Sequence, residues 1–258
     1  MASGRVYLFV DNSNIFISAK DVGESREGRF ARDAVRLEFE HLIQLALAGR
    51  TLAEAFVVGS IPPEQRAVWE RLTAKTGIVP ELYERGRLTG GEQGLDQCLQ
   101  VHMLRAISDN TEPQIGVLLT GDGAGYDDGV GFHADIERMY AAGWGIEVLS
   151  WERSCRRTLR DWASANGAFV KLDDHYNSIT FLEGTRRPTP LNLATRPKAS
   201  VRQSPMQAAE ARATAAAAQA IQELQREVET LKTRKAAKDA RRERFLKQQA
   251  RRAERQNK

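Results

Sequence analysis

The 258-residue sequence contains only two cysteines, Cys98 and Cys155, with no Cys-x-x-Cys spacing and no His/Cys cluster around them. This scarcity gives no sign of a disulfide framework or a structural zinc site, and it is typical of a reducing compartment, so we expect a cytoplasmic location. The first apolar run has five residues and ends at Asp11, which is too short for a signal peptide. No apolar segment approaches the roughly 20 residues of a membrane span, so we expect no membrane partner.

Charge is unevenly distributed along the chain. Residues 1–185 contain 19 Lys/Arg and 27 Asp/Glu, a net charge of −8, whereas residues 186–258 contain 19 Lys/Arg and 7 Asp/Glu, a net charge of +12. An acidic globular part followed by a basic tail suggests that the tail is attracted to a polyanion such as RNA or DNA. The alternative interpretation of the tail is a solvated charged helix without a partner.

Short apolar runs alternate with segments of helical spacing over the first 185 residues. The strand-like runs cover 5–10, 55–60, 78–84, 115–120, 145–150 and 168–172, and the helical segments cover 33–48, 63–75, 95–108, 133–142 and 154–166. Because parallel neighbours need crossover connections, this alternation predicts a three-layer α/β domain with a mostly parallel central sheet over residues 1–185.

The composition changes after this domain. Residues 186–204 are rich in proline and poor in apolar residues, which predicts a linker, and residues 205–258 predict a long helix because no Gly or Pro follows Pro205. Ile221, Leu224, Val228 and Leu231 form a short a/d seam that could pair with a second copy to give a homodimer. Residues 232–258 hold 12 Lys/Arg against three acids, which favours phosphate binding with little sequence preference.

Two of the apolar runs end on an aspartate followed by small polar residues. Residues 6–10 lead into Asp11, and residues 115–119 lead through Thr120 and Gly121 into Asp122. In an open α/β sheet, the carboxyl ends of the strands form the edge where sites occur. Asp96, in a helical segment between the two runs, adds a third acid. Three converging carboxylates are suited to a hard divalent cation, so the sequence predicts a metal-dependent site at Asp11, Asp96 and Asp122.

The polar residues around these acids allow a functional and a structural interpretation. Asn14 could orient Asp11 or a bound water, although residues 11–14 would equally form a turn and a helix N-cap. Thr120 could offer its hydroxyl to a carboxylate or a phosphate. Asp96 could serve only as an N-terminal helical acid. Asp127 and Asp128, in a glycine-rich loop, could supply a further ligand, and we assign Asp127 to the metal set with Asp128 as the alternative.

Four stretches of residues 5–172 resemble the NYN domain, a branch of the PIN-like nuclease superfamily related to 5′ exonucleases. These are the Asp-x-x-Asn of residues 11–14, the helix-borne Asp96, the Thr-Gly-Asp of residues 120–122 and the strand that follows at 143–151. Two positions depart from the family pattern, because Gln93 stands where a lysine is common and Ala124 stands where a second aspartate is usual. The glycine-rich loop that follows Asp122 is an insertion relative to the family pattern. Asp127 or Asp128 in this loop could take the place of the family's second aspartate.

The resemblance implies hydrolysis of phosphodiester bonds with Mg²⁺ or Mn²⁺ held by Asp11, Asp96 and Asp122, with RNA as the favoured substrate. Asn14, Thr120 and Arg87 are the expected substrate-binding residues. The competing hypothesis is a non-catalytic RNA- or DNA-binding or scaffold protein that uses the same fold and the basic tail. A phosphatase of the haloacid dehalogenase type is rejected, because it needs a second aspartate where Ser13 stands.

Overall fold

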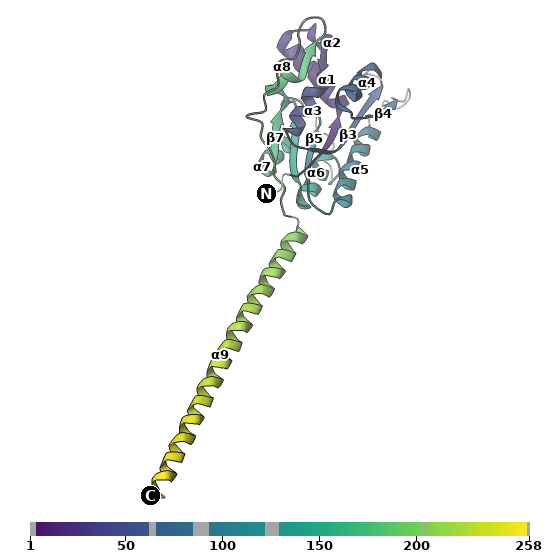
Figure 1. The fold of residues 1–258 in the computed structure, drawn as a ribbon. Coiled ribbons are helices and arrows are strands. Elements are labelled where there is room, and N and C mark those ends of the chain that lie inside the picture. Colours follow the sequence, from purple (N-terminus) through teal and green to yellow (C-terminus); the bar gives the residue numbers. More distant parts are fainter. Residues whose placement is uncertain (1–3, 62–65, 85–92, 122–128, 204, 257–258) are drawn as a thin grey trace. The chain divides into compact units, whose positions relative to one another are not determined.

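The computed structural model describes residues 4–61, 66–84, 93–121, 129–203 and 205–256 (Figure 1). Its internal contacts divide the chain into two units, Met1–Pro205 and Met206–Lys258. The first unit contains every described strand and all described helices except the C-terminal one.

A six-stranded sheet with the order β4-β3-β1-β5-β6-β7 forms the centre of the first unit, and all of its pairings are parallel. Its strands are β1 (Val6–Asp11), β3 (Leu52–Ile61), β4 (Glu81–Glu84), β5 (Ile115–Leu119), β6 (Gly145–Ser150) and β7 (Ala168–Lys171). The predicted α/β class with a mostly parallel central sheet is therefore confirmed. Because β1 and β5 are both internal and adjacent, the residues that follow them meet at one carboxyl edge of the sheet.

Helices cover both faces of this sheet, and the alternation of side chains along β1 separates the two cores. Val6, Leu8 and Val10 pack on one side, whereas Tyr7 and Phe9 pack on the other. The first face is covered by α1 (Asn12–Glu27), α3 (Phe39–Leu47), α4 (Arg66–Thr76) and α8 (Tyr176–Ile179), and the second by α5 (Gln93–Asp109), α6 (Phe132–Ala141) and α7 (Arg157–Asn166). Both faces of the central strands are thus buried, which explains their nearly continuous apolar sequence.

The region before β3 differs from the sequence-based expectation. Instead of one helix over residues 33–48, the chain forms α2 (Ala31–Ala34), β2 (Val35–Leu37) and α3. β2 pairs antiparallel with β8 (Thr180–Leu182), which follows a 3₁₀ turn, η1 (Leu172–His175), and α8. Val35 and Leu37 are buried and Arg36 between them is not, so this short stretch has the period of a strand.

Residues 186–203, which the sequence predicts to be a linker, pack against the first unit. Leu191, Leu193 and Val201 lie against its apolar core, and the Arg196 side chain is fully buried. The guanidinium of Arg196 donates to the carbonyls of Leu45 and Ala46, at the end of α3. The ordered domain therefore extends about 20 residues beyond the boundary at residue 185, and the second unit begins at Met206.

The second unit is a single helix, α9 (Pro205–Gln256). Ile221, Leu224 and Val228 of the a/d seam are exposed on this helix, which is expected when one chain is described without a partner. The pairing of this seam with a second copy stays a prediction. Within the described residues, no helix combines the length and the apolar character that crossing a membrane requires.

Candidate functional site at the carboxyl edge of the sheet

Asp11 is the last residue of β1 and the N-cap of α1. Its Oδ1 accepts a hydrogen bond from the Asn14 backbone N–H at 3.2 Å, and its Oδ2 accepts one from the Asn14 amide Nδ2 at 2.5 Å. Only 2% of Asp11 is exposed. The Asp-x-x-Asn pattern thus forms both structures that the sequence allowed, a helix cap and an oriented buried carboxylate.

The end of β5 is packed tightly against the first turn of α1. A Cβ atom on Gly121 would lie 2.5 Å from the carbonyl oxygen of Asn14, so this close approach requires glycine. The Gly121 carbonyl accepts a hydrogen bond from Ser150 Oγ at the end of β6, at 3.3 Å. Three neighbouring strands are therefore joined where the predicted site residues lie.

Two buried polar side chains beside Asp11 have no hydrogen-bond partner among the described residues. They are the amide of Asn12, which follows Asp11, and the hydroxyl of Thr120, which follows β5, and both residues are 0% exposed. A buried polar group that stays unpaired is costly, so such groups are expected where an ion, water or substrate is bound. The structure places Asn14 and Thr120 at this edge, as the sequence predicts.

Asp96 approaches the same edge from α5. Tyr7 Oη, near the start of β1, donates to Asn110 Oδ1 at 2.8 Å, and Asn110 directly follows α5. The end of α5 therefore lies beside the start of β1, and the beginning of α5, with Asp96, lies toward the end of β1. Asp96 precedes Leu99 and Met103 on the stripe that packs against Phe9. Asp11 continues the Tyr7 and Phe9 side of β1, so both acids belong to the same face and edge.

Other expected site residues lie outside the part of the chain that the structure describes. These are Asp122, Asp127, its alternative Asp128 and Arg87. The described part thus brings together Asp11, Asn14 and Thr120, with Asp96 on the same side of the sheet. The three-aspartate cluster itself stays a prediction.

A second group of polar side chains lies on the same face, between β4 and α5. Glu81 Oε2 accepts a hydrogen bond from the Cys98 thiol at 3.1 Å, and Glu81 Oε1 lies 2.7 Å from His102 Nε2. Burial raises the pKa of the Cys98 thiol. A hydrogen bond with Cys98 is the main reason that the pKa of Tyr83 is raised to about 12.

This group, which we call the Glu81 cluster (Glu81, Cys98 and His102), was not predicted from the sequence. One signal was present, because Cys98 and His102 are four residues apart in a predicted helix and so share a face. Glu81 could not be added from the sequence, since its position depends on the pairing of β4 with β3 and on the packing of α5.

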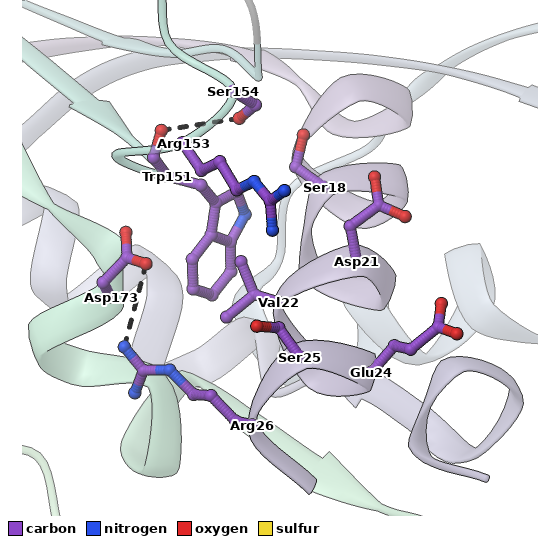
Figure 2. Close-up of a pocket in the computed structure, with 10 residues that line it drawn as sticks. All are labelled: Ser18, Asp21, Val22, Glu24, Ser25, Arg26, Trp151, Arg153, Ser154 and Asp173. Atoms are coloured by element: carbon purple, nitrogen blue, oxygen red, sulfur yellow. Dashed lines mark hydrogen bonds and ion pairs between the residues drawn. The ribbon is translucent and has the colours of Figure 1, made fainter. Parts of the chain in front are cut away.

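A pocket of about 630 Å³ lies on the α1 side of the sheet edge (Figure 2). Trp151, the residue after β6, forms its buried wall and donates from Nε1 to the carbonyl of Ile15 at 3.0 Å. Asp21 and Glu24 are ion-paired with Arg32, and Arg26 lies 3.7 Å from Asp173. Arg153, which also lines the pocket, has no acidic partner among the described residues. Its guanidinium group is therefore available to bind an anion.

Comparisons with known proteins add little to this description. No known protein family matches the chain, and no curated protein matches it. A solved structure of a protein of unknown function from Vibrio parahaemolyticus RIMD 2210633 is similar at 17% identity, with a TM-score of 0.46, over 67% of this chain and 94% of that one. A likeness at this level identifies neither a family nor an activity.

Proposed function

We propose that residues 1–205 form a PIN-like, metal-dependent nuclease of the NYN type that hydrolyses phosphodiester bonds, with RNA as the favoured substrate. The observation that carries the proposal is the position of Asp11. Its buried carboxylate is held by Asn14 at the carboxyl end of a central parallel strand, on the sheet face and edge that Asp96 also approaches. The Asp-x-x-Asn and Thr-Gly-Asp patterns support the same class.

The described residues fit Mg²⁺ or Mn²⁺. Asp11 and Asp96 supply carboxylate oxygens, the ligands that these hard cations prefer, and the proposal adds Asp122 as the third. The unpaired Asn12 amide and Thr120 hydroxyl supply further polar groups at the edge. When bound, the cation would stabilise charge on the phosphoryl group and favour ionisation of the attacking water.

The roles of the protein residues follow from their positions. Asn14 fixes the Asp11 carboxylate through two hydrogen bonds and so orients it toward the edge rather than letting it rotate. The start of α1 adds the positive end of a helix dipole, which attracts a phosphate. Thr120 offers a hydroxyl that can donate to a phosphate oxygen. No protein side chain is needed as the nucleophile.

Cationic groups outside the aspartate cluster would bind the rest of the substrate. Arg153 in the pocket beside α1 is placed to meet a backbone phosphate, and the Trp151 ring forms the adjoining wall (Figure 2). Arg87 keeps its proposed role from the sequence. The basic residues of α9 would add affinity without sequence preference, because they act on the phosphate backbone.

The decisive experiment measures cleavage of end-labelled single-stranded RNA and DNA by the full-length protein with Mg²⁺, Mn²⁺ or EDTA. Asp11→Asn and Asp96→Asn are each compared with Asp161→Asn, which removes an exposed carboxylate on α7. We expect metal-dependent cleavage that falls by more than about 100-fold in the first two variants, since loss of even an outer-sphere partner costs about 10–100-fold. The control should retain wild-type activity.

Two results would contradict the proposal. Cleavage that survives in both Asp11→Asn and Asp96→Asn would assign it to another site or to a contaminant. Salt-sensitive RNA binding without cleavage in any metal would favour the alternative, a binding or scaffold protein, which the basic tail supports on its own.

A further inference from the structure

The Glu81 cluster combines three types of metal ligand in one place. One ligand atom from each residue, namely Cys98 Sγ, a ring nitrogen of His102 and a carboxylate oxygen of Glu81, lies within 4.8 Å of the other two. Glu81 joins the two others directly, at 3.1 Å to the thiol and 2.7 Å to the imidazole. All three residues are partly buried, so their side chains are restrained but remain accessible from solvent.

The fold determines this arrangement through two independent constraints. In the sheet, Glu81 pairs with Val58 and Val58 pairs with Asp11, so Glu81 lies on the rung of Asp11 and points to the face covered by α5. On α5, Cys98 and His102 are one turn apart and share a side. The His102 ring is stacked on Phe56 with a centroid separation of 4.1 Å, which fixes the ring while its Nε2 faces Glu81.

The chemistry of the three donors distinguishes the cluster from the aspartate site. Thiolate and imidazole are preferred by Zn²⁺ and disfavoured by Mg²⁺, and zinc sites with three protein ligands keep a fourth position for water or another group. We propose that Glu81, Cys98 and His102 bind Zn²⁺ as a second metal site, separate from the proposed nuclease centre. Tyr83 is a neighbour of the cluster and is hydrogen-bonded to Cys98.

The two sites use different sides of α5. Asp96 and Cys98 are two residues apart, which places them about 200° apart around the helix axis. Asp96 continues the stripe of Leu99 and Met103 toward β1, whereas Cys98 and His102 face Glu81 on the edge strand β4. Zinc bound by the Glu81 cluster would therefore link β4 to α5 and stabilise the folded chain, because the unfolded chain lacks the assembled site.

Hydrogen bonds alone could also account for the cluster, since the thiol donates to Glu81 and the imidazole can do the same. Cobalt distinguishes the two interpretations. Co²⁺ substituted for Zn²⁺ gives a sulfur-to-cobalt charge-transfer band only when a cysteine is a ligand, and visible ligand-field bands that report tetrahedral geometry. The full-length protein, stripped with EDTA and desalted, is titrated with Co²⁺ and then with Zn²⁺.

We expect one equivalent of Co²⁺ to produce the charge-transfer band and Zn²⁺ to abolish it, while Mg²⁺ leaves it unchanged. Cys98→Ser should lose the band, and Glu81→Gln and His102→Gln should weaken zinc binding at least tenfold in competition with a chromophoric chelator. Cys155→Ser removes the other cysteine and should keep the band. Melting curves recorded without metal verify that each variant is folded.

Zinc at 100 times its dissociation constant should raise the melting temperature of the wild-type protein by about 5–10 °C, and this shift should be lost in Cys98→Ser. Asp11→Asn separates the two proposals, since it should abolish cleavage and leave the cobalt band intact. Absence of a charge-transfer band in the wild-type protein, or its persistence in Cys98→Ser, would overturn the zinc site without affecting the nuclease proposal.

Discussion

Glu147 Oε2 lies 2.6 Å from Arg196 Nη1, and both side chains are fully buried. The other carboxylate oxygen accepts the backbone N–H of Ala199 at 2.7 Å, and Arg50 reaches both oxygens at 2.7 Å. Burial lowers the pKa of Arg196, and the attraction of Glu147 opposes this effect. One carboxylate on β6 therefore holds residues 196–199 on the domain and is the shared ion-pair partner of two guanidinium groups.

Replacing Glu147 should be strongly destabilising. Glu147→Gln leaves Arg196 buried without a counter-charge, and breaking a buried pair in this way costs about 3–5 kcal/mol of unfolding free energy. Urea denaturation followed by tryptophan fluorescence measures the loss. Glu183→Gln, which breaks the more exposed pair with Arg36, is the matched control and should change stability by less than about 1 kcal/mol. Equal losses in the two variants would contradict a special role for the buried pair.

Asp11 caps α1, and in the proposed nuclease it also holds the metal; different substitutions can separate these two roles. Asp11→Asn keeps a side-chain oxygen for the Asn14 N–H, so the N-cap is retained, but it replaces the acceptor of the Asn14 Nδ2 bond; the melting temperature should therefore fall less than in Asp11→Ala. Asp11→Ala removes the N-cap and should lower the free energy of unfolding by about 0.5–2 kcal/mol. Both should abolish cleavage. Retained activity in Asp11→Asn would show that only the cap matters.

The sequence was sufficient for the features that depend on local pattern. The apolar runs that became β1, β5 and β6 were evident because both faces of a central parallel strand are buried. Asp11, Asn14 and Thr120 could be assigned to one edge for the same reason, since the carboxyl ends of parallel strands meet there.

Features that depend on tertiary packing were missed. A helix N-cap at residues 11–14 was allowed, but α1 itself was not among the predicted helices, because its apolar residues lack a clear helical period and its glycine and serines lower the intrinsic preference for helix. β2 is three residues long and forms only because β8 returns beside it. The linker prediction for 186–204 followed from proline content. Proline content does not reveal that Arg196 forms a buried ion pair with Glu147, which is distant in the sequence.

Arg153 should contribute to substrate binding rather than to folding. Its side chain is exposed in the pocket and has no acidic partner among the described residues, so Arg153→Ala should leave the melting temperature unchanged. We expect KM for single-stranded RNA to rise about tenfold, which corresponds to about 1.4 kcal/mol. Arg71→Ala, on the exposed side of α4, is the control. A change in kcat with constant KM would argue against this role.

His133 should make stability depend on pH. Burial lowers its pKa, and Glu137, one turn later, opposes this only partly. The unfolded chain then binds a proton more readily than the folded one, so stability is full above the unfolded pKa of about 6.5 and falls as pH decreases below it, by up to about 1.4 kcal/mol per pH unit.

Unfolding free energies measured between pH 7.5 and 5 test this effect. His133→Phe keeps an aromatic ring beside Trp162 and removes the titrating group, so its stability should fall less steeply with acidification. The pKa of His175 is also lowered, mainly by burial, which means that part of the slope should remain in this variant. An unchanged slope would exclude His133 as a source.

The basic end of α9 should determine the salt dependence of RNA binding. Arginine-to-glutamine changes at 241, 242, 244, 251, 252 and 255 remove six charges and retain residues with good helix propensity. The slope of log K against log salt concentration should become less steep by up to about 4, because each phosphate contact on a single strand contributes about 0.7 to the slope. Fluorescence anisotropy with labelled single-stranded RNA at several salt concentrations measures this slope.

Cleavage at low salt and saturating substrate should persist, because the proposed nuclease centre lies in residues 1–205. An identical slope in the wild-type and substituted proteins would place the phosphate contacts on the domain instead.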